Sequence, residues 1–296
     1  MSPVQRARGG HNLGGSEAKA DEPTSDGRIL VRRHALFVRV SHWLNVLFMT
    51  VLLFSGLQIF NAHPALYWGP QSTFAHPALA IDATQAPNGE PIGYLQIGKA
   101  VFHTTGVLGV SSQAGQPQAR AFPAWLTLPA QQDLATGRRW HFFFAWLFVF
   151  NGAAYLAWTI FSGHVRRDLW PTRSDLAHIG RSIVEHLRLK FPKGEEARHY
   201  NVLQKLAYVL VIFVLAPLML VTGLTMSPGM DAQAPWLLVL LGGRQSARAI
   251  HFITASSLVL FVFVHVTMVF LAGFWNEIRS MITGRYAIEA DGKPQP

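Results

Sequence analysis

The 296-residue sequence contains no cysteine, and only 14% of its residues are charged. The absence of cysteine excludes disulfides, thiolate zinc sites, iron–sulfur clusters and the CxxCH attachment of a c-type haem. A soluble globular chain carries about a quarter of its residues as Asp, Glu, Lys and Arg, whereas half of this chain is apolar. The composition therefore indicates an integral membrane protein, in which any metal must be held by His, Met or oxygen.

Four apolar runs are long enough to form transmembrane helices, which need about 20 mostly apolar residues to cross about 30 Å of hydrocarbon. We predict an all-α fold, an integral membrane four-helix bundle, with spans at about 36–61, 138–162, 203–226 and 247–275. Pro217 lies inside the third span. A proline is tolerated there because neighbouring groups can satisfy the backbone carbonyl that it frees.

The basic residues are concentrated on one side of these spans. Residues 1–40 hold seven Lys and Arg, residues 162–205 hold nine and the tail after the fourth span holds three, so 19 of the 25 share a side. Positive residues close to spans are retained in the cytoplasm. This distribution predicts two cytoplasmic termini, a cytoplasmic loop at 163–202 and a long external loop at 62–137. It also makes nucleic-acid binding an unnecessary explanation of the +9 charge.

The chain divides into a membrane domain and two short ends. Residues 1–30 are polar and Gly-rich, which predicts a disordered cytoplasmic N-terminus. Residues 31–286 form the predicted membrane domain, and residues 287–296 form a cytoplasmic tail. Within the cytoplasmic loop, IGRSIVEHLRLKF has basic and apolar residues at helical spacing, which predicts an amphipathic element on the inner leaflet.

Four histidines lie in or at the entry to a span: His42, His141, His251 and His265. An ionisable side chain at membrane depth is costly, and it marks a functional site or a buried hydrogen-bond partner. His251 and His265 are 14 residues apart, so they lie within about 40° of one helix face and about 21 Å apart in depth. The directions of the spans then place His141 with His251 on the outer side, and His42 with His265 on the inner side.

Each of these pairs could clamp one flat ligand between two helices. Axial ligation of a non-covalent haem needs this arrangement, with an imidazole nitrogen on each side of the iron. Gly56 falls at the depth of the outer pair and Gly152 at that of the inner pair, where a missing side chain would let a helix pass close to a porphyrin. Ordinary helix packing explains both glycines equally well.

Three arginines precede the histidines by two or three residues and could pair with haem propionates at the two surfaces. Snorkelling of the side chains to the interface is the alternative. The three residues are Arg39, Arg139 and Arg248.

Several motifs together resemble the bacterial cytochrome b561 and nickel-hydrogenase b-type cytochrome family. They are RVSHWLN at 39–45, RRWHFFFAW at 138–146, RHYNVLQKLAY at 198–208, and ARAIHFITA with FVHVTMV in the fourth span. The resemblance covers Val31 to Tyr286. Within the family the sequence is most similar to the group labelled thiosulfate reductase cytochrome b subunit-like, whose members are often companions of molybdopterin-dependent oxidoreductases.

The resemblance implies a cytochrome with two non-covalent b haems. In that family the first-span histidine pairs with the second histidine of the fourth span, and the second-span histidine with the first, in agreement with the depths derived above. It also implies electron transfer between a periplasmic oxidoreductase subunit and a quinone near the cytoplasmic haem, in the bacterial inner membrane. Asn201 and Gln204 are the candidate quinone contacts; helix capping by Asn201 and a surface position for Gln204 are the alternatives.

The sequence thus predicts a respiratory electron-transfer subunit, with no catalytic residues of its own and with partners limited to an oxidoreductase subunit, quinone and lipid. The external loop is longer than in hydrogenase cytochromes and could cover the outer haem or dock the partner. One alternative is a self-contained oxidoreductase that acts on superoxide or a ferric chelate at the outer haem. The other is a divalent-metal transporter that uses the four histidines as a relay.

Overall fold

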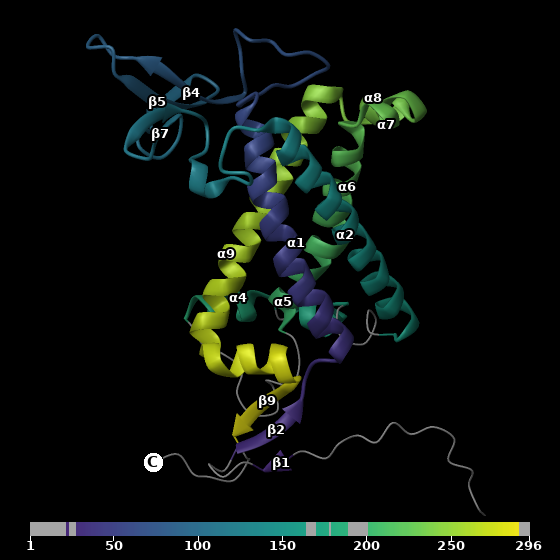
Figure 1. Cartoon of the computed structure of the whole chain (residues 1–296). Coiled ribbons are helices and arrows are strands. Elements are labelled where there is room, and N and C mark those ends of the chain that lie inside the picture. The colour runs from purple at the N-terminus through teal and green to yellow at the C-terminus, as the bar shows by residue number, and fades with distance from the viewer. Residues whose placement is uncertain (1–21, 24–27, 164–169, 178, 189–200, 290–296) are drawn as a thin grey trace, which may run out of the picture.

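The computed structural model describes residues 22–23, 28–163, 170–177, 179–188 and 201–289. Four helical segments are long and apolar enough to cross a membrane. They are α1 (Leu36–Asn61), α2 (Leu134–Phe161), the continuous helix Val202–Thr225 and α9 (Arg244–Thr283). Helix α1 packs along α2, and α6 (Ala216–Thr225) packs along α9 (Figure 1). The chain is therefore mostly helical, with four candidate spans close to the predicted ranges.

The bundle has small polar side chains inside and large apolar side chains outside. The largest fully buried side chains among the described residues are all polar, and all lie in the four long helices: Ser55, Gln58, Thr159, Thr222, Thr225 and Ser280. Exposed side chains on the spanning helices include Phe143, Phe150 and Phe263. This pattern suits lipid, because helices in a membrane associate through small and hydrogen-bonding residues.

The third span is one helix with a wide turn in its middle. It runs through α5 (Val202–Leu210), the π-helical segment η4 (Val211–Leu215) and α6. Pro217 lacks an amide hydrogen and its ring would clash with a carbonyl four residues earlier. The Ala216 amide instead bonds the Val211 carbonyl, five residues back. The wide turn thus accommodates the proline without ending the helix.

Helix α9 has 40 residues, about 60 Å at 1.5 Å per residue, and is too long for one span. Gly273 breaks it with φ 116° and ψ 76°, a conformation that favours glycine. The segment beyond Gly273 turns across the end of the bundle (Figure 1). Gly284 ends the helix in the left-handed conformation.

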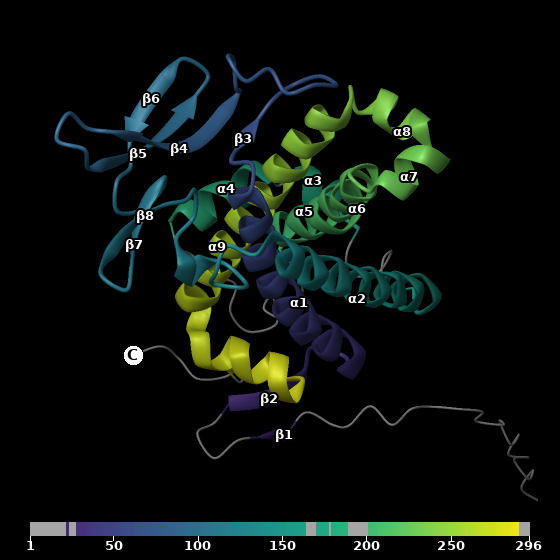
Figure 2. The same ribbon diagram turned by 45° about the horizontal axis from the view of Figure 1, so that its top comes forward.

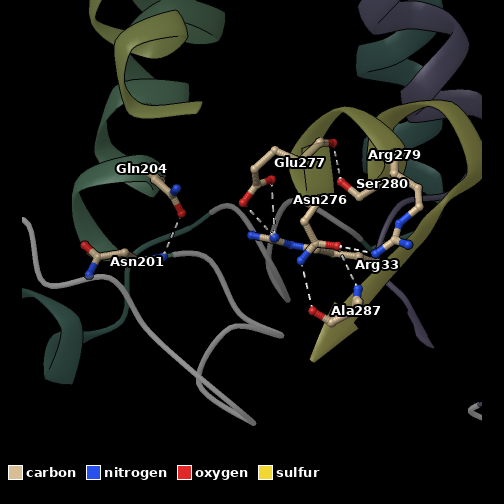
Figure 3. A network of polar contacts seen from close by, with 8 residues as sticks. All are labelled: Arg33, Asn201, Gln204, Asn276, Glu277, Arg279, Ser280 and Ala287. Carbon is tan, nitrogen blue, oxygen red and sulfur yellow. Dashed lines mark hydrogen bonds and ion pairs between the residues drawn. The ribbon is translucent and has the colours of Figure 1, made fainter. Parts of the chain in front are cut away.

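A small sheet closes the end of the bundle at which α1 begins. It has the order β1-β2-β9, all antiparallel, from Glu22–Pro23, Arg28–Arg32 and Arg285–Glu289. Arg33 pairs with Glu277 at 3.4 Å, and Asn276 exchanges two hydrogen bonds with the Ala287 backbone (Figure 3). These contacts fasten the last part of α9 to the start of α1.

Part of the N-terminal segment that the sequence predicted to be disordered, and part of the predicted cytoplasmic tail, therefore belong to strands. Residues 22–23 and 28–30 lie in β1 and β2, and residues 287–289 lie in β9. The rest of those two predictions, over 1–21, 24–27 and 290–296, lies outside the described residues. Apolar Val31 and Ile288 pack together across β2 and β9, a pairing between distant segments that local composition does not indicate.

The connection between α1 and α2 is also strand-rich, which corrects the all-α class. A four-stranded sheet has the order β3-β4-β5-β6, from Ala65–Leu66, Leu79–Gln85, Pro91–Ile97 and Ala100–His103. A hairpin follows from β7 (Val110–Gln113) and β8 (Gln116–Ala119). Figure 2 shows both on one side of the bundle, away from α2. These strands are short and are separated by turns that contain Gly and Pro. Their signal in the sequence is therefore weaker than that of the long apolar spans.

The shorter helices lie outside the four spans. They are η1 (Ala124–Leu126), α3 (Arg173–Ala177), α4 (Ile179–Leu187), α7 (Pro228–Gln233) and α8 (Pro235–Leu240). Helix α4 contains the first part of the predicted amphipathic element. Residues 189–191, at its end, lie outside the described residues.

Arg120 fastens the strand-rich segment to α1. Its side chain is buried and donates to the carbonyls of Phe122 and Ala130 and to the Thr127 hydroxyl, and it lies 3.4 Å from the Gln58 amide oxygen. Burial lowers the pKa of this guanidinium from its ordinary value. No carboxylate pairs with it among these contacts, so its charge is compensated by oxygen dipoles.

We expect Arg120→Met to loosen residues 62–133, because each acceptor left unpaired in a buried place costs about 1–3 kcal/mol. Limited proteolysis and thermal melting in detergent would show faster cleavage in this segment and a lower melting temperature. Lys99→Met, at an exposed position, is the matched control. An Arg120→Met protein with the cleavage rate and melting temperature of the control would contradict the anchoring role.

Candidate functional site

The structure brings the four span histidines together as two pairs. The rings of His141 in α2 and His251 in α9 have centroids 6.3 Å apart, with 63° between their planes. The rings of His42 in α1 and His265 in α9 are also 6.3 Å apart, with 59° between their planes. The pairing derived from depth alone is thus the one that the fold makes.

The spacing of the rings matches a metal ion held between two imidazoles. A bond of about 2.0 Å from nitrogen to metal, together with about 1.15 Å from nitrogen to ring centre, places the two centres about 6.3 Å apart. Two imidazoles in direct hydrogen-bonded contact would need a donor and an acceptor about 2.9 Å apart, and no such bond joins either pair. The two imidazoles of each pair could therefore hold one metal ion between them.

Helix α1 fixes the ring of His141. Its Nδ1 lies 3.1 Å from the Leu52 carbonyl oxygen and 3.1 Å from the Ser55 hydroxyl oxygen. Because a carbonyl can only accept, Nδ1 carries the hydrogen. The lone pair of the neutral ring is therefore on Nε2, the nitrogen left for a metal.

Helix α6 fixes the ring of His251 in the same way. Its Nδ1 lies 2.9 Å from the Thr222 hydroxyl oxygen, and the Met219 backbone faces the same ring. Met219 precedes Thr222 by three residues, as Leu52 precedes Ser55. Both outer histidines therefore hydrogen-bond a hydroxyl on the neighbouring helix, and each lies close to the backbone three residues before that hydroxyl.

A glycine lies beside each of these hydroxyls. A Cβ atom built on Gly56 would lie 3.3 Å from Cε1 of His141, and one built on Gly223 would lie 3.5 Å from Cε1 of His251. The first distance is tighter than ordinary contact, and the second is ordinary contact. Gly56 thus lets the His141 ring lie against α1, at the depth that the sequence predicted.

The inner pair has a different environment. Nδ1 of His42 is buried and has no hydrogen-bond partner among the described residues. His265 stacks on Phe261 at 5.9 Å. Next to His42, the Asn151 amide donates to the Ser41 carbonyl and to the Asn45 side chain, which joins α2 to α1. The inner rings are therefore held mainly by packing.

The three candidate arginines have different surroundings. Arg39 donates to the Ile282 carbonyl, and Arg248 donates to the carbonyls of Ala65 and His63. Arg139 is exposed, with a 3.4 Å contact to the Thr136 hydroxyl. Two of the three guanidiniums thus hold backbone segments in place, and pairing with propionates stays a prediction for all three.

The remaining candidates are Gly152, Asn201 and Gln204. A Cβ atom at Gly152 would meet nothing within 4 Å, so there is open space beside α2. Asn201 caps α5 and forms a capping box with Gln204, at the end of the bundle that also holds the Arg33–Glu277 pair (Figure 3). Capping uses the two amide oxygens, in line with the alternative named above for Asn201.

The family described as prokaryotic cytochrome b561 matches residues 33–284. The chain belongs to this family. As a b-type cytochrome, it binds b-type haem and transfers electrons. It is also 29% identical over 238 residues to a protein of Azospira oryzae named putative protein-methionine-sulfoxide reductase subunit YedZ1, covering 80% of this chain and 90% of that protein.

Three residues of the cytochrome's site were missed in the sequence: Ser55, Thr222 and Gly223. The signal was a short repeat, because Ser55–Leu57 reads SGL in the first span and Thr222–Leu224 reads TGL in the third. Neither tripeptide is distinctive without the knowledge that each faces a histidine on the next helix. Their role follows from tertiary packing.

We expect Gly56→Val to lower the haem bound per chain, because the new side chain would displace the His141 ring. Haem per purified chain, by the pyridine haemochrome assay, is the measurement. Ala153→Val, on an exposed face of α2, is the control and should keep full haem. Full haem in Gly56→Val would mean that the close approach of α1 to His141 is dispensable.

Proposed function

We propose that this cytochrome is a di-haem membrane subunit that carries electrons between an external oxidoreductase subunit and the quinone pool of a respiratory chain. The observation that carries the proposal is the distance between the ring centroids of each histidine pair, which is 6.3 Å in both pairs. In each pair the two histidines lie on different helices. In this proposal His141 and His251 hold the outer haem, and His42 and His265 hold the inner haem. Each b haem would accept and release one electron at its iron.

The chain's own residues have binding and insulating roles in this proposal. Neutral imidazoles supply the nitrogen lone pairs, and the carbonyls and hydroxyls around them set which ring nitrogen is free. The apolar exterior of the helices keeps the sites within lipid and away from water. Arg39, Arg139 and Arg248 remain candidates for the propionates at the two surfaces.

A quinone site is proposed at the end of the bundle where α5 begins. The amide oxygens of Asn201 and Gln204 are engaged in capping, so a quinone carbonyl would be bound by their amide nitrogens. The Arg33–Glu277 ion pair lies at the same end (Figure 3). A polar cluster at this membrane surface is suited to a ligand with two carbonyl oxygens and a ring.

The partner is proposed to be a periplasmic oxidoreductase subunit, possessing a molybdopterin cofactor. Support comes from the relative whose name describes it as a subunit of a methionine-sulfoxide reductase. Residues 62–133 project from the opposite end of the bundle to the proposed quinone site (Figure 1). They are therefore the candidate platform for that partner.

Electron transfer is favoured over the divalent-metal transporter. Among the described residues, no group of three or more His, Asp or Glu side chains could hold a metal ion. A histidine relay would also need compensation for a doubly charged ion inside lipid. Family membership points in the same direction.

We expect each histidine substitution to remove one specific haem. His42→Ala and His265→Ala should both lower the count from two haems to one and leave the same visible spectrum, since they lose the inner haem. His141→Ala and His251→Ala should both leave the other haem. The measurements are the haemochrome count and the reduced-minus-oxidised spectrum.

His76→Ala, outside the spans, is the control for these four variants. A His42→Ala spectrum that matched His251→Ala rather than His265→Ala would contradict the assignment of the pairs.

The proposed orientation in the inner membrane is testable because the chain has no native cysteine. Gln118→Cys in β8 and Ala177→Cys in α3 each create one exposed thiol. With the outer membrane permeabilised, a membrane-impermeant maleimide should label Gln118→Cys in intact cells and label Ala177→Cys only after lysis. The reverse pattern would invert the topology.

A further inference from the structure

Two segments on different helices form matching cradles for the outer histidines. In α1 the cradle is Leu52, Ser55 and Gly56 around His141, and in α6 it is Met219, Thr222 and Gly223 around His251. Sequence spacing within the two cradles is identical. The inner histidines have no such arrangement, since Nδ1 of His42 is buried without a hydrogen-bond partner in the described part of the chain.

The two hydroxyls accept hydrogen bonds from the rings. Ser55 Oγ donates its own hydrogen to the Val51 carbonyl at 2.6 Å, and Thr222 Oγ1 donates to the Leu218 carbonyl at 2.6 Å. Each hydroxyl has one hydrogen. Its remaining lone pairs therefore face the N–H of the imidazole. Ser55 and Thr222 are both fully buried, so water does not compete for these bonds.

Acceptors on Nδ1–H change the chemistry of the nitrogen on the other side of the ring. They draw the hydrogen away from the ring and make Nε2 a stronger electron donor. A stronger axial donor stabilises ferric iron relative to ferrous iron, which lowers the reduction potential of a haem. The same residues would also hold both rings at a fixed orientation.

We infer that Ser55 and Thr222 are positioning residues that lower the reduction potential of the outer haem through Nδ1 of His141 and His251. The inference rests on the proposed assignment of these histidines as haem ligands. The inner haem lacks an equivalent acceptor at His42, so the two haems differ in how strongly their axial ligands donate. The couple concerned is ferric haem plus one electron giving ferrous haem.

Thr222→Val tests this role, because valine keeps the branched shape and removes the hydroxyl. The test is run in the His42→Ala background, which keeps only the outer haem, by redox titration of the full chain in detergent with dithionite and ferricyanide. We expect the ferrous-to-ferric ratio at a fixed ambient potential to rise by up to about tenfold, an upward shift of up to about 59 mV for one electron. Ser55→Ala should shift the midpoint in the same direction.

Two controls separate this effect from a general loss of structure. Thr222→Ser keeps the hydroxyl and should restore the original midpoint. Thr50→Val removes a hydroxyl that bonds the carbonyl four residues back in α1 and touches no histidine, so it should shift nothing. If Thr222→Val proves unstable, Ser55→Ala becomes the test, because the Leu52 carbonyl still hydrogen-bonds the His141 ring in that variant.

The inference would be overturned by midpoints for Thr222→Val and Ser55→Ala equal to that of the parent, with haem content intact. It would also be overturned if Thr222→Ser shifted the midpoint as much as Thr222→Val. Failure of the proposed function would give a different result from failure of this inference. The unsubstituted chain itself would then bind fewer than two haems per molecule.

Discussion

The structure depends on the cost of placing an imidazole between apolar helices. A ring nitrogen buried without a partner is expensive, so each histidine requires either a hydrogen-bond partner or a ligand. In the outer pair, helix carbonyls and hydroxyls satisfy Nδ1 of His141 and His251. This leaves Nε2 for a ligand and fixes the packing of α1 on α2 and of α6 on α9. The small residues of the bundle interior follow from the same requirement, because large side chains would separate these helices.

The spans and the histidine pairs could be predicted from the sequence because their signals are local. Apolar length defines a span, and the 14 residues between His251 and His265 define both a face and two depths. The break at Gly273 lies close to the predicted end of the fourth span, at about residue 275. The strands at both ends of the bundle could not be predicted in this way, since β2 pairs with β9 across most of the chain.

The side chains that surround the histidines were also beyond local analysis. Ser55 and Thr222 are ordinary residues for a membrane helix, and only their contacts with a neighbouring helix give them a role. Arg248 is a second example. Its position three residues before His251 predicts a role at a haem propionate, and the fold adds hydrogen bonds from its guanidinium to the carbonyls of His63 and Ala65 that this spacing does not indicate. In both cases the partner lies on a segment remote in sequence, and sequence spacing carries no information about it.

The central claim is that two pairs of histidines each hold one b haem. The most direct test is the dithionite-reduced minus oxidised visible spectrum of the purified, full-length chain, with a pyridine haemochrome count per molecule. Low-spin b-type bands and two haems per chain are the expected result. A well-folded preparation with no haem, or with one haem that persists when any single one of the four histidines is replaced, would contradict it.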